Sequence, residues 1–559
     1  MCYSPNVLFP LRHDLRHTAV MKMLPDLSQL THEQLLEFTR QLAMQHQSLA
    51  QSNQELEKSN QQLDAKVQHL SILNQKYEHE LALFKKHKFG SKNEHLNAKQ
   101  IHLWDEAVEE DIAAVDLELE RLNADKTDAA TQKATVNKPK CRLLPDHLHT
   151  IRIEHEPAST QCSCGCQLRR IGEDISEKLH FRPAQFYKEE HVRGKWVCDQ
   201  CDTLTQQAMP AYMIDKGIAS PELLSHVLVS KYADHLPLYR QRLIYQRAGI
   251  DLSRSTLSDW IGRCGVELEP LANALKQVVL QQRVIHADET PVTIMRMGEN
   301  EKKPKKGYVW AYATTQYNPV QAVIYDFQDS RSGQHAEAFL NGWQGHLVCD
   351  DYSGYKARFK SGQVIEVGCM AHARRKFHEL HVTGKSQIAE QALVLIQKLY
   401  AIEAELRKKT DGTAEHRREY RQQHSQPVMQ QLYEWLNQHY LAVPSSSPTA
   451  KAINYSLKRW QALCRYLDDG NLPIDMSSIA AQGIENQMCP WALGRKNWLF
   501  AGSLRSGQRA ANIMTLIQSA KLNGLDPYAY LSDVLKRLPT HKVTQIEELL
   551  PHRWKSDQN

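Results

Sequence analysis

The sequence predicts a multidomain α+β protein with an N-terminal coiled coil, a zinc-binding β unit, a helical region and an RNase H-like α/β core that carries a large helical insertion. Three observations support this prediction. Leucines recur at every seventh position near the N-terminus, cysteines fall in two tight clusters, and two later apolar runs end in aspartate. The 559 residues also exceed the about 250–300 residues to which a single core grows, so several domains are expected.

The charge composition is nearly balanced, with 69 Lys and Arg against 64 Asp and Glu. Bulk charge therefore does not argue for nucleic-acid binding, which has to come from local basic clusters. The sequence has no apolar run of about 18 residues, so no membrane span is expected. Clustered cysteines favour metal binding in a reducing cytoplasm over disulfides. Residues 1–30 are expected to be disordered or an upstream extension, because Met21 or Met23 is an alternative start.

Residues 31–95 have the pattern of a leucine-zipper-like coiled coil. The heptad leucines are Leu35, Leu42, Leu49, Leu56, Leu63 and Leu70. No Gly or Pro interrupts these heptads, so one continuous helix is predicted. With leucine at position d, position a contains Asn53, Asn60 and Asn74, which favour a parallel dimer at a cost in stability. The alternative is an amphipathic helix packed on its own domain. Residues 96–140 are charged and poor in aromatics, which is typical of a linker.

Residues 141–215 are expected to form a small zinc-binding domain. The stretch between the two cysteine clusters alternates in polarity and is rich in aromatics, which predicts a pair of strands. Two close pairs of thiolates at hairpin ends supply the tetrahedral ligands that structural Zn²⁺ requires. We expect the zinc ligands to be Cys162, Cys164, Cys198 and Cys201, with Cys166 as a substitute in the first pair. The alternative is a set of reduced, metal-free cysteines.

Residues 216–282 are predicted to be a helical DNA-binding region. The pattern is a helix, a turn at 248–250 and a second helix capped by Ser253 or Ser255. This spacing matches a helix-turn-helix, whose second helix enters the major groove. The side chains expected to contact phosphates are Arg240, Arg242, Arg247 and Arg254. Helical hairpins with arginines also occur as ordinary surface features.

Residues 283–510 are expected to form the α/β core. Three apolar strands, RVIHADETPVTI, GYVWAYATT and PVQAVIYDF, precede a helix and two further strands, HLVCD and VIEVGC, which is the RNase H-like order. In that fold the first and fourth strands place carboxylates side by side, and here these are Asp288 and Asp350. Their neighbours Glu289 and Asp351 point to the opposite faces of the strands.

The third acidic residue of the predicted site, Glu485, follows a helical insertion expected at about 380–470. With Asp288 and Asp350 it could hold two divalent cations about 4 Å apart, Mg²⁺ or Mn²⁺, an arrangement that cleaves phosphodiesters. Taken singly, an aspartate at a strand end is equally a turn former or a helix cap. Residues 511–559 are expected to form a C-terminal helical segment.

Two basic clusters lie near these acidic residues in the sequence. One is expected to hold the DNA backbone and consists of Arg374, Arg375 and Lys376. The other, Arg495 and Lys496, fits either a DNA contact at a helix end or a strand packed on the core. Cys369 and His372 have CxxH spacing, but no second pair accompanies them. This favours a packing cysteine and a histidine near the active site over a metal site.

The motifs of the chain, taken together and in order, resemble those of one known family. They are KFGSKNEHL, the cysteine clusters, SKYADHLPLYRQ, HADETPV, CDDYSGY, GCMAHARRKF, ALGRKNWLFAGS and AKLNGLDPYAYLSDVL. The chain is similar to insertion-sequence-66-type transposases of the DDE class from about residue 23 onward. The resemblance implies a bacterial, nucleoid-associated enzyme that binds the terminal inverted repeats of its own element and target DNA, with companion proteins from the same element. It places the catalytic triad on Asp288, Asp350 and Glu485.

The segment before Glu485 departs from the pattern of that family. Members carry an Asp-Asn-Asn stretch a few residues before the third carboxylate and an Arg after it, whereas this chain replaces both Asn and has Cys489. Loss of a positive charge near a scissile phosphate weakens stabilisation of the transition state. Three hypotheses are therefore considered. The chain is an active transposase, a catalytically decayed transposase that retains only DNA binding, or an unrelated RNase H-like nuclease.

Overall fold

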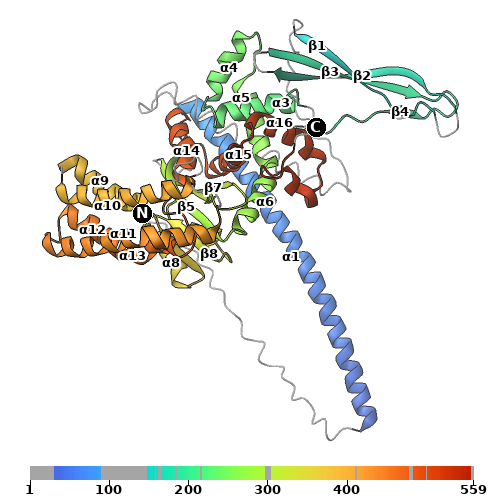
Figure 1. The fold of residues 1–559 in the computed structure, drawn as a ribbon. Helices are drawn as coiled ribbons and strands as arrows, with labels where there is room; N and C mark the ends of the chain where they lie inside the picture. Colours follow the sequence, from blue (N-terminus) through green and yellow to red (C-terminus); the bar gives the residue numbers. More distant parts are fainter. Residues whose placement is uncertain are drawn as a thin grey trace, which may run out of the picture. The chain divides into compact units, whose positions relative to one another are not determined.

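A computed structural model of the chain describes residues 31–89, 148–157, 159–161, 166–182, 185–214, 217–295, 304–384, 386–408, 412–476, 483–498 and 500–555 (Figure 1). The chain divides into two units, Met1–Ser71 and Ile72–Asn559, each of which is considered by itself. The expectations for residues 1–30 and 96–140 lie outside the described residues.

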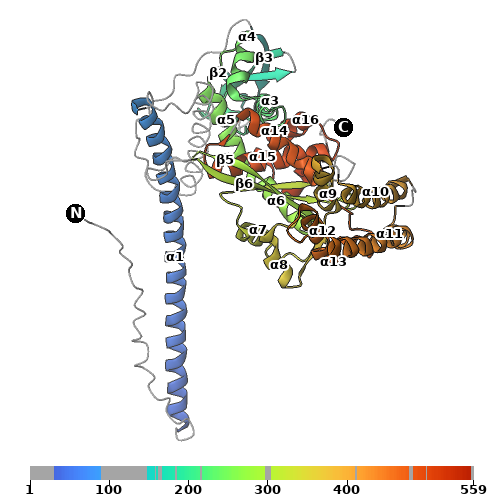
Figure 2. The ribbon, with the colours of Figure 1, turned by 90° about the vertical axis from the view of Figure 1, so that its left-hand side faces the viewer.

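The first described element is α1, His32–Phe89, an unbroken helix of 58 residues (Figure 2). The heptad pattern predicted one continuous helix, and the structure contains one. The later heptad leucines, Leu56, Leu63 and Leu70, expose between 52% and 57% of their surface on this single chain. Such a row of exposed leucines needs a partner surface. Pairing with a second copy stays a prediction.

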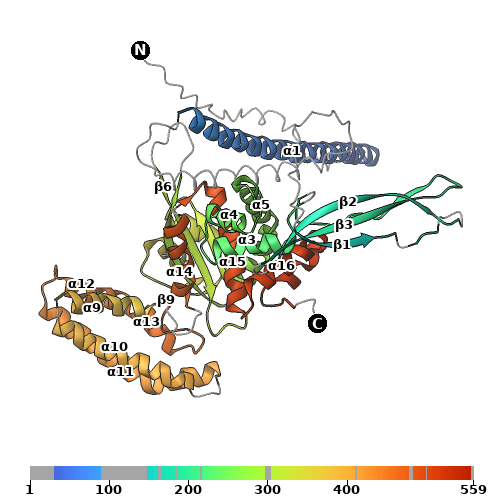
Figure 3. The same ribbon diagram turned by 90° about the horizontal axis from the view of Figure 1, so that it is seen from above.

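A four-stranded sheet follows, with the strands β1 (His149–His155), β2 (Arg169–Arg182), β3 (Gln185–Val197) and β4 (Leu204–Gln206). β2 and β3 form a long antiparallel hairpin, while β1 pairs with β3 in parallel (Figure 3). The pair of strands predicted between the cysteine clusters is thus confirmed. At the hairpin tip, Phe181 stacks on His226, so this end of the hairpin packs against the helices that follow.

Four helices come next: α3 (Pro221–Tyr232), α4 (Leu238–Arg247), α5 (Arg254–Glu267) and α6 (Glu269–Leu280). The predicted turn contains Gly249 with φ +81°, and Ser253 caps α5 by accepting the Thr256 N–H. α5 is nearly enclosed, since Ser255 is its one exposed residue. One face of α5 packs in the core, while Arg254, Thr256, Asp259 and Arg263 on the other face are half-buried. Entry of this helix into a major groove stays a prediction.

The central sheet has the order β7-β6-β5-β8-β9, with the short β10 (Phe500–Ala501) beside β5. Its strands are β5 (Val284–Ile294), β6 (Lys305–Thr314), β7 (Val323–Gln328), β8 (Gly345–Cys349) and β9 (Val364–Gly368). The first three pair antiparallel, and β8 runs parallel to both β5 and β9. All five strands and the helix α7 (Gly333–Phe339) occur in the predicted order.

The helix α15, Leu504–Leu522, covers the edge of the central sheet. The Ser519 and Thr515 hydroxyls accept the N–H groups of Val323 and Tyr325 on β7. Backbone donors of an edge strand are thereby paired instead of left open. Shorter elements complete this part of the chain: 3₁₀ turns at Ser353–Tyr355, Arg465–Leu467, Leu538–Thr540 and Val543–Leu549, and the helices α8 (Lys356–Lys360) and α16 (Pro527–Arg537).

The predicted helical insertion is present as α9 (Met370–Gly384), α10 (Gln387–Lys408), α11 (Ala414–Ala442), α12 (Pro448–Lys458) and α13 (Trp460–Cys464). The long helices α10 and α11 pack against each other (Figures 1 and 3). The buried pair of Arg421 and Glu403 joins them, and Arg421 also donates to the carbonyl of Leu472. Within the described residues, no helix is long and apolar enough to cross a membrane.

A candidate carboxylate site on the central sheet

Asp288 on β5 and Asp350, which directly follows β8, lie at the same level of the central sheet. β5 and β8 are parallel, and His286 on β5 is in register with Val348 on β8. Asp288 and Asp350 each come two residues further along. Because side chains alternate between the faces of a strand, two residues on restores the same face. The sheet thus brings together two aspartates that lie far apart in the sequence.

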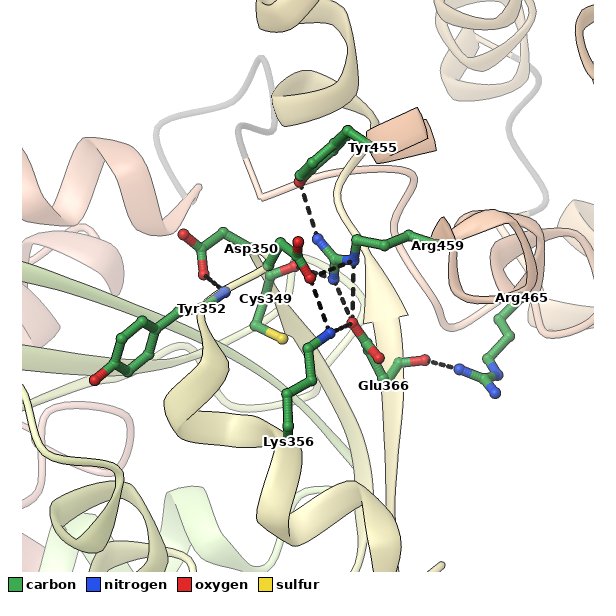
Figure 4. A network of polar contacts seen from close by, with 9 residues as sticks. Cys349, Asp350, Tyr352, Lys356, Glu366, Tyr455, Arg459 and Arg465 are labelled. Atoms are coloured by element: carbon green, nitrogen blue, oxygen red, sulfur yellow. Dashed lines mark hydrogen bonds and ion pairs between the residues drawn. The ribbon is translucent and has the colours of Figure 1, made fainter. Parts of the chain in front are cut away.

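Asp288 is a strongly perturbed acid. Its carboxylate accepts the N–H of Glu289 at 2.9 Å. Burial, followed by the negative charges of Glu289, Asp350 and Glu485, raises the pKa of Asp288 to about 7. Asp350 accepts the N–H of Tyr352 at 2.8 Å (Figure 4). A buried carboxylate among other carboxylates gains most from a positively charged ligand.

Glu289, the neighbour of Asp288, is committed to other partners. Its side chain is 1% exposed and pairs with Arg331, which lies over the ring of Tyr352. Tyr355 donates its hydroxyl hydrogen to the second oxygen of Glu289 at 3.0 Å. Burial raises the pKa of Glu289, Arg331 opposes this change, and the charge of Asp350 raises the pKa further, so Glu289 also lies near Asp350. The preference for Asp288 over Glu289 as a member of the triad stays a prediction.

Glu485 approaches from a different element, in the first turn of α14 (Ile484–Trp498). Arg495 fixes this helix to β5 by donating to the carbonyl of Pro291 at 2.8 Å and to the Thr290 hydroxyl. Arg495 thus contacts the core from a helix and not from a strand, and its contact with DNA stays a prediction. Lys496 is exposed and free to contact a ligand outside the helix.

The three carboxylates influence one another electrostatically without closing on a common point. Asp350 and Glu485 both act on the pKa of Asp288. In the part of the chain that the structure describes, however, no three His, Cys, Asp or Glu side chains are close enough together to hold a metal ion. Their hard, anionic oxygens are the donors that Mg²⁺ and Mn²⁺ take. The donor chemistry fits such a cation, while ligand distances would require local movement.

The helix α9 brings further groups to this site. Burial lowers the pKa of His372, and the charges of Asp350 and Glu485 oppose that change, so the imidazole lies near both. Arg375 places Nη2 at 3.3 Å from Glu485 Oε1. Its neighbours Arg374 and Lys376 are also exposed. Cys369 is buried and accepts the N–H of Met476, the packing role expected for it.

Beneath Asp350 lies a cluster that the sequence did not reveal, here called the floor network: Arg459, Glu366, Lys356 and Asp351 (Figure 4). Arg459 is 3% exposed in its side chain and lies 2.6 Å from Glu366 on β9. It also donates to the carbonyl of Cys349, the residue before Asp350. Lys356 pairs with Asp351 at 2.9 Å.

No local pattern links the members of the floor network. Glu366 interrupts an apolar strand, and that was the one available signal. Arg459 lies in the helical insertion, 93 residues away in the chain. Only the packing of the insertion on the sheet shows that they meet.

The cysteine clusters are partly described. Cys198 is completely buried, and Cys201 is exposed. Cys166 packs with Cys198 in a small cluster together with Leu168 and Trp196. The preferred ligands Cys162 and Cys164 lie outside the described residues. Cys166 and Cys198 thus belong to one small cluster near the end of β3, and thiolates are the ligands that structural zinc takes.

The basic residues of the helical region differ in accessibility. Arg240 and Arg247 are exposed on α4. Arg242 pairs with Asp251 at 3.4 Å, and Arg254 is half-buried at the start of α5. The exposed basic surface of this region is therefore on α4, the first helix of the predicted pair.

Comparison with known families identifies the class of protein. The family model described as "Transposase IS66 family" matches residues 216–509, and "IS66 C-terminal element" matches 515–552. The "zinc-finger binding domain of transposase IS66" matches 159–202, and "Transposase C of IS166 homeodomain" matches 76–153. The chain belongs to the IS66 transposase family, as its motifs predicted. The last match includes residues that we expected to be linker.

Relatives extend over most of the chain. The uncharacterized protein y4qI of Sinorhizobium fredii is 35% identical over 493 residues, which cover 85% of this chain and 88% of that protein. The uncharacterized protein y4jD of the same organism is 37% identical, covering 78% and 87%. A third, y4hP, is 34% identical, covering 76% and 78%.

Proposed function

We propose that this chain binds the ends of its own insertion sequence and catalyses metal-dependent DNA cleavage and strand transfer. The observation that carries the proposal is that the charges of Asp350 and Glu485 both act on Asp288, although these residues come from two parallel strands and a later helix. The strand order, three antiparallel strands followed by two parallel ones, supports an RNase H-like core. Membership of the IS66 transposase family supplies the reaction class.

In this proposal Asp288, Asp350 and Glu485 hold Mg²⁺ or Mn²⁺. Bound cations would activate the attacking oxygen and stabilise the leaving one. The residues of the chain would present the anionic oxygens, and the Asp288 carboxyl would release one proton. Because the pKa of Asp288 is about 7, this carboxyl still holds its proton at slightly acidic pH and must release it to become a ligand.

The remaining domains would recognise DNA and assemble the complex. Structural Zn²⁺ would be bound by Cys198 and Cys201 with two thiols of the first cluster, and the packing of Cys166 against the cluster that contains Cys198 favours Cys166 as one of them. The exposed Arg240 and Arg247, with Arg374 and Lys376 beside the carboxylates, would hold DNA phosphates. The set also includes Arg242, Arg254, Arg375 and Lys496. Association through α1, companion proteins of the element and a place in the cytoplasm at the nucleoid belong to the same proposal.

The decisive experiment replaces Asp350 with asparagine. Asp350→Asn keeps the shape but removes an anionic ligand, so Mg²⁺-dependent cleavage of DNA carrying the element's ends should fall at least 100-fold, by about 3 kcal/mol in transition-state stabilisation. DNA binding should survive. Asp351→Asn is the matched comparison, and it should reduce cleavage far less because Asp351 pairs with Lys356. Equal losses from both substitutions would overturn the triad assignment.

A catalytically decayed transposase is the second candidate. It is favoured by Cys489, which is exposed one turn after Glu485 and donates its thiol hydrogen to the Glu485 carbonyl instead of offering a cation. DNA-end binding without cleavage, in the wild type and in Cys489→Arg alike, would establish this alternative.

A further inference from the structure

The ion pair between Arg375 and Glu485 joins two segments that lie 110 residues apart, at the edge of the carboxylate site. Glu485 is one of the three residues proposed to bind cations. We propose that Arg375 is a latch: it competes with the divalent cation for Glu485 and, once displaced, its guanidinium binds a DNA phosphate. This inference rests on the proposed function and adds a step to it, because cation binding and DNA engagement become coupled through one side chain.

The ion pair between Arg375 and Glu485 is exposed enough to be broken without unfolding the surrounding core. The Arg375 side chain is 54% exposed and that of Glu485 29%. Exposed ion pairs are weak and are screened by salt. Two other arginine–carboxylate pairs are more enclosed: Arg421 and Glu403 are both buried, and the Glu289 partner of Arg331 is enclosed. A divalent cation with direct carboxylate ligation can displace the weak pair, not the enclosed ones.

The backbone that carries Arg375 is fixed, so that opening requires only a side-chain rotation. α9 begins directly after β9, whose neighbour β8 ends beside Asp350. The Met370 N–H donates to the carbonyl of Ile474, and Cys369 accepts the N–H of Met476. His372 lies three residues before Arg375, on the same face of the helix, and its pKa responds to Asp350 and Glu485. This face of α9 therefore looks onto the carboxylates.

A guanidinium is suited to both partners of the proposed exchange. Its planar fork donates two parallel hydrogen bonds to a carboxylate or to a phosphate. Arg374 and Lys376 are one position away on either side, which turns them about 100° around the helix from Arg375. The ring of Tyr455 lies under the Lys376 ammonium at 5.9 Å. Arg375 is thus the member of this cluster that reaches Glu485.

The latch predicts two effects of opposite sign from one substitution. Arg375→Ala frees Glu485, so the affinity for the cation should rise about two- to fivefold, the strength of an exposed ion pair. At saturating cation the same variant lacks the phosphate contact, so cleavage should fall about tenfold or more. Arg375→Lys should recover part of the cleavage rate, because a point charge replaces the fork. A side chain that only supports the fold would lower both quantities together.

The test titrates the zinc-loaded full-length chain with Mn²⁺ alone, followed by electron paramagnetic resonance of the free ion. The variants are Arg375→Ala, its neighbour Arg374→Ala as the charge-matched control, Glu485→Gln and the double variant with Arg375→Ala. We expect tighter Mn²⁺ binding in Arg375→Ala than in Arg374→Ala, and no tightening in the Glu485→Gln background. Thermal unfolding midpoints identify any variant that fails to fold.

Each outcome has a separate meaning. If Arg375→Ala binds Mn²⁺ no more tightly than the wild type or Arg374→Ala, the latch is wrong while the carboxylate site stands. If Arg375→Ala tightens binding and cleaves normally, the phosphate half of the inference is wrong. If the wild type binds no Mn²⁺ beyond what Asp350→Asn binds, the proposed function fails and the latch fails with it.

Discussion

The carboxylate site has an arginine below it and an arginine at its edge, and the two are held very differently. Arg459 in the floor network is 3% exposed and donates to Glu366, Tyr455 and the Cys349 carbonyl. Arg375 makes one ion pair, to Glu485, and is 54% exposed. The comparison teaches that an ion pair around an active site can serve opposite purposes. The enclosed arginine fixes the backbone beside Asp350, while the exposed one holds Glu485 in an ion pair that, in our proposal, a cation displaces.

The largest expected effect is on stability and comes from replacing Arg459 in the floor network. Arg459→Met removes one partner of a buried pair and leaves Glu366 and the Cys349 carbonyl without it, which should cost on the order of 3 kcal/mol in the free energy of unfolding. Arg375→Met should cost less than about 1 kcal/mol, because its pair is exposed. The measurement is urea unfolding of the two variants beside the wild type. Similar losses from both would remove the distinction between floor and edge.

The middle-sized effect concerns the proton on Asp288. Its pKa of about 7 in the folded chain lies above the ordinary value of 3.8. The stability that this group contributes is therefore complete below about pH 4 and is lost as the pH rises through about 7. Cation binding requires release of the proton, so Mn²⁺ affinity should fall about tenfold per pH unit below pH 7 and level off above it.

Binding isotherms of Mn²⁺ between pH 5.5 and 8.5 check this expectation. Arg375→Ala is the informative comparison, because it should shift the whole curve to tighter binding without moving its midpoint. An affinity that stays constant over this range would show that Asp288 is not a ligand, or that its carboxyl is already ionised.

Much of this site could be predicted from the sequence, because strands can be recognised from short stretches of neighbouring residues. The apolar runs before Asp288 and Asp350, and the alternation that separates Asp351 from Asp350, depend on neighbouring residues alone. The floor network could not be predicted, since Arg459 and Glu366 meet only after the helical insertion packs on β9. The packing of α5 could also be predicted, because Leu257, Trp260, Ile261 and Cys264 repeat at core spacing and all are buried.

The smallest expected effect sharpens the comparison by adding a charge at the edge. Cys489 is exposed one turn after Glu485 on α14. In Cys489→Arg a second guanidinium would lie near Glu485, since residues four apart are neighbours on a helix. At saturating Mg²⁺ it should raise cleavage severalfold by supplying positive charge to the scissile phosphate. It should also weaken Mn²⁺ binding about twofold, because it adds a competitor for Glu485. Cysteine to serine at the same position is the control for loss of the thiol. If cleavage rises equally in both variants, the increase comes from removing the thiol. The positive charge of the introduced arginine would then have no role at the edge of the site.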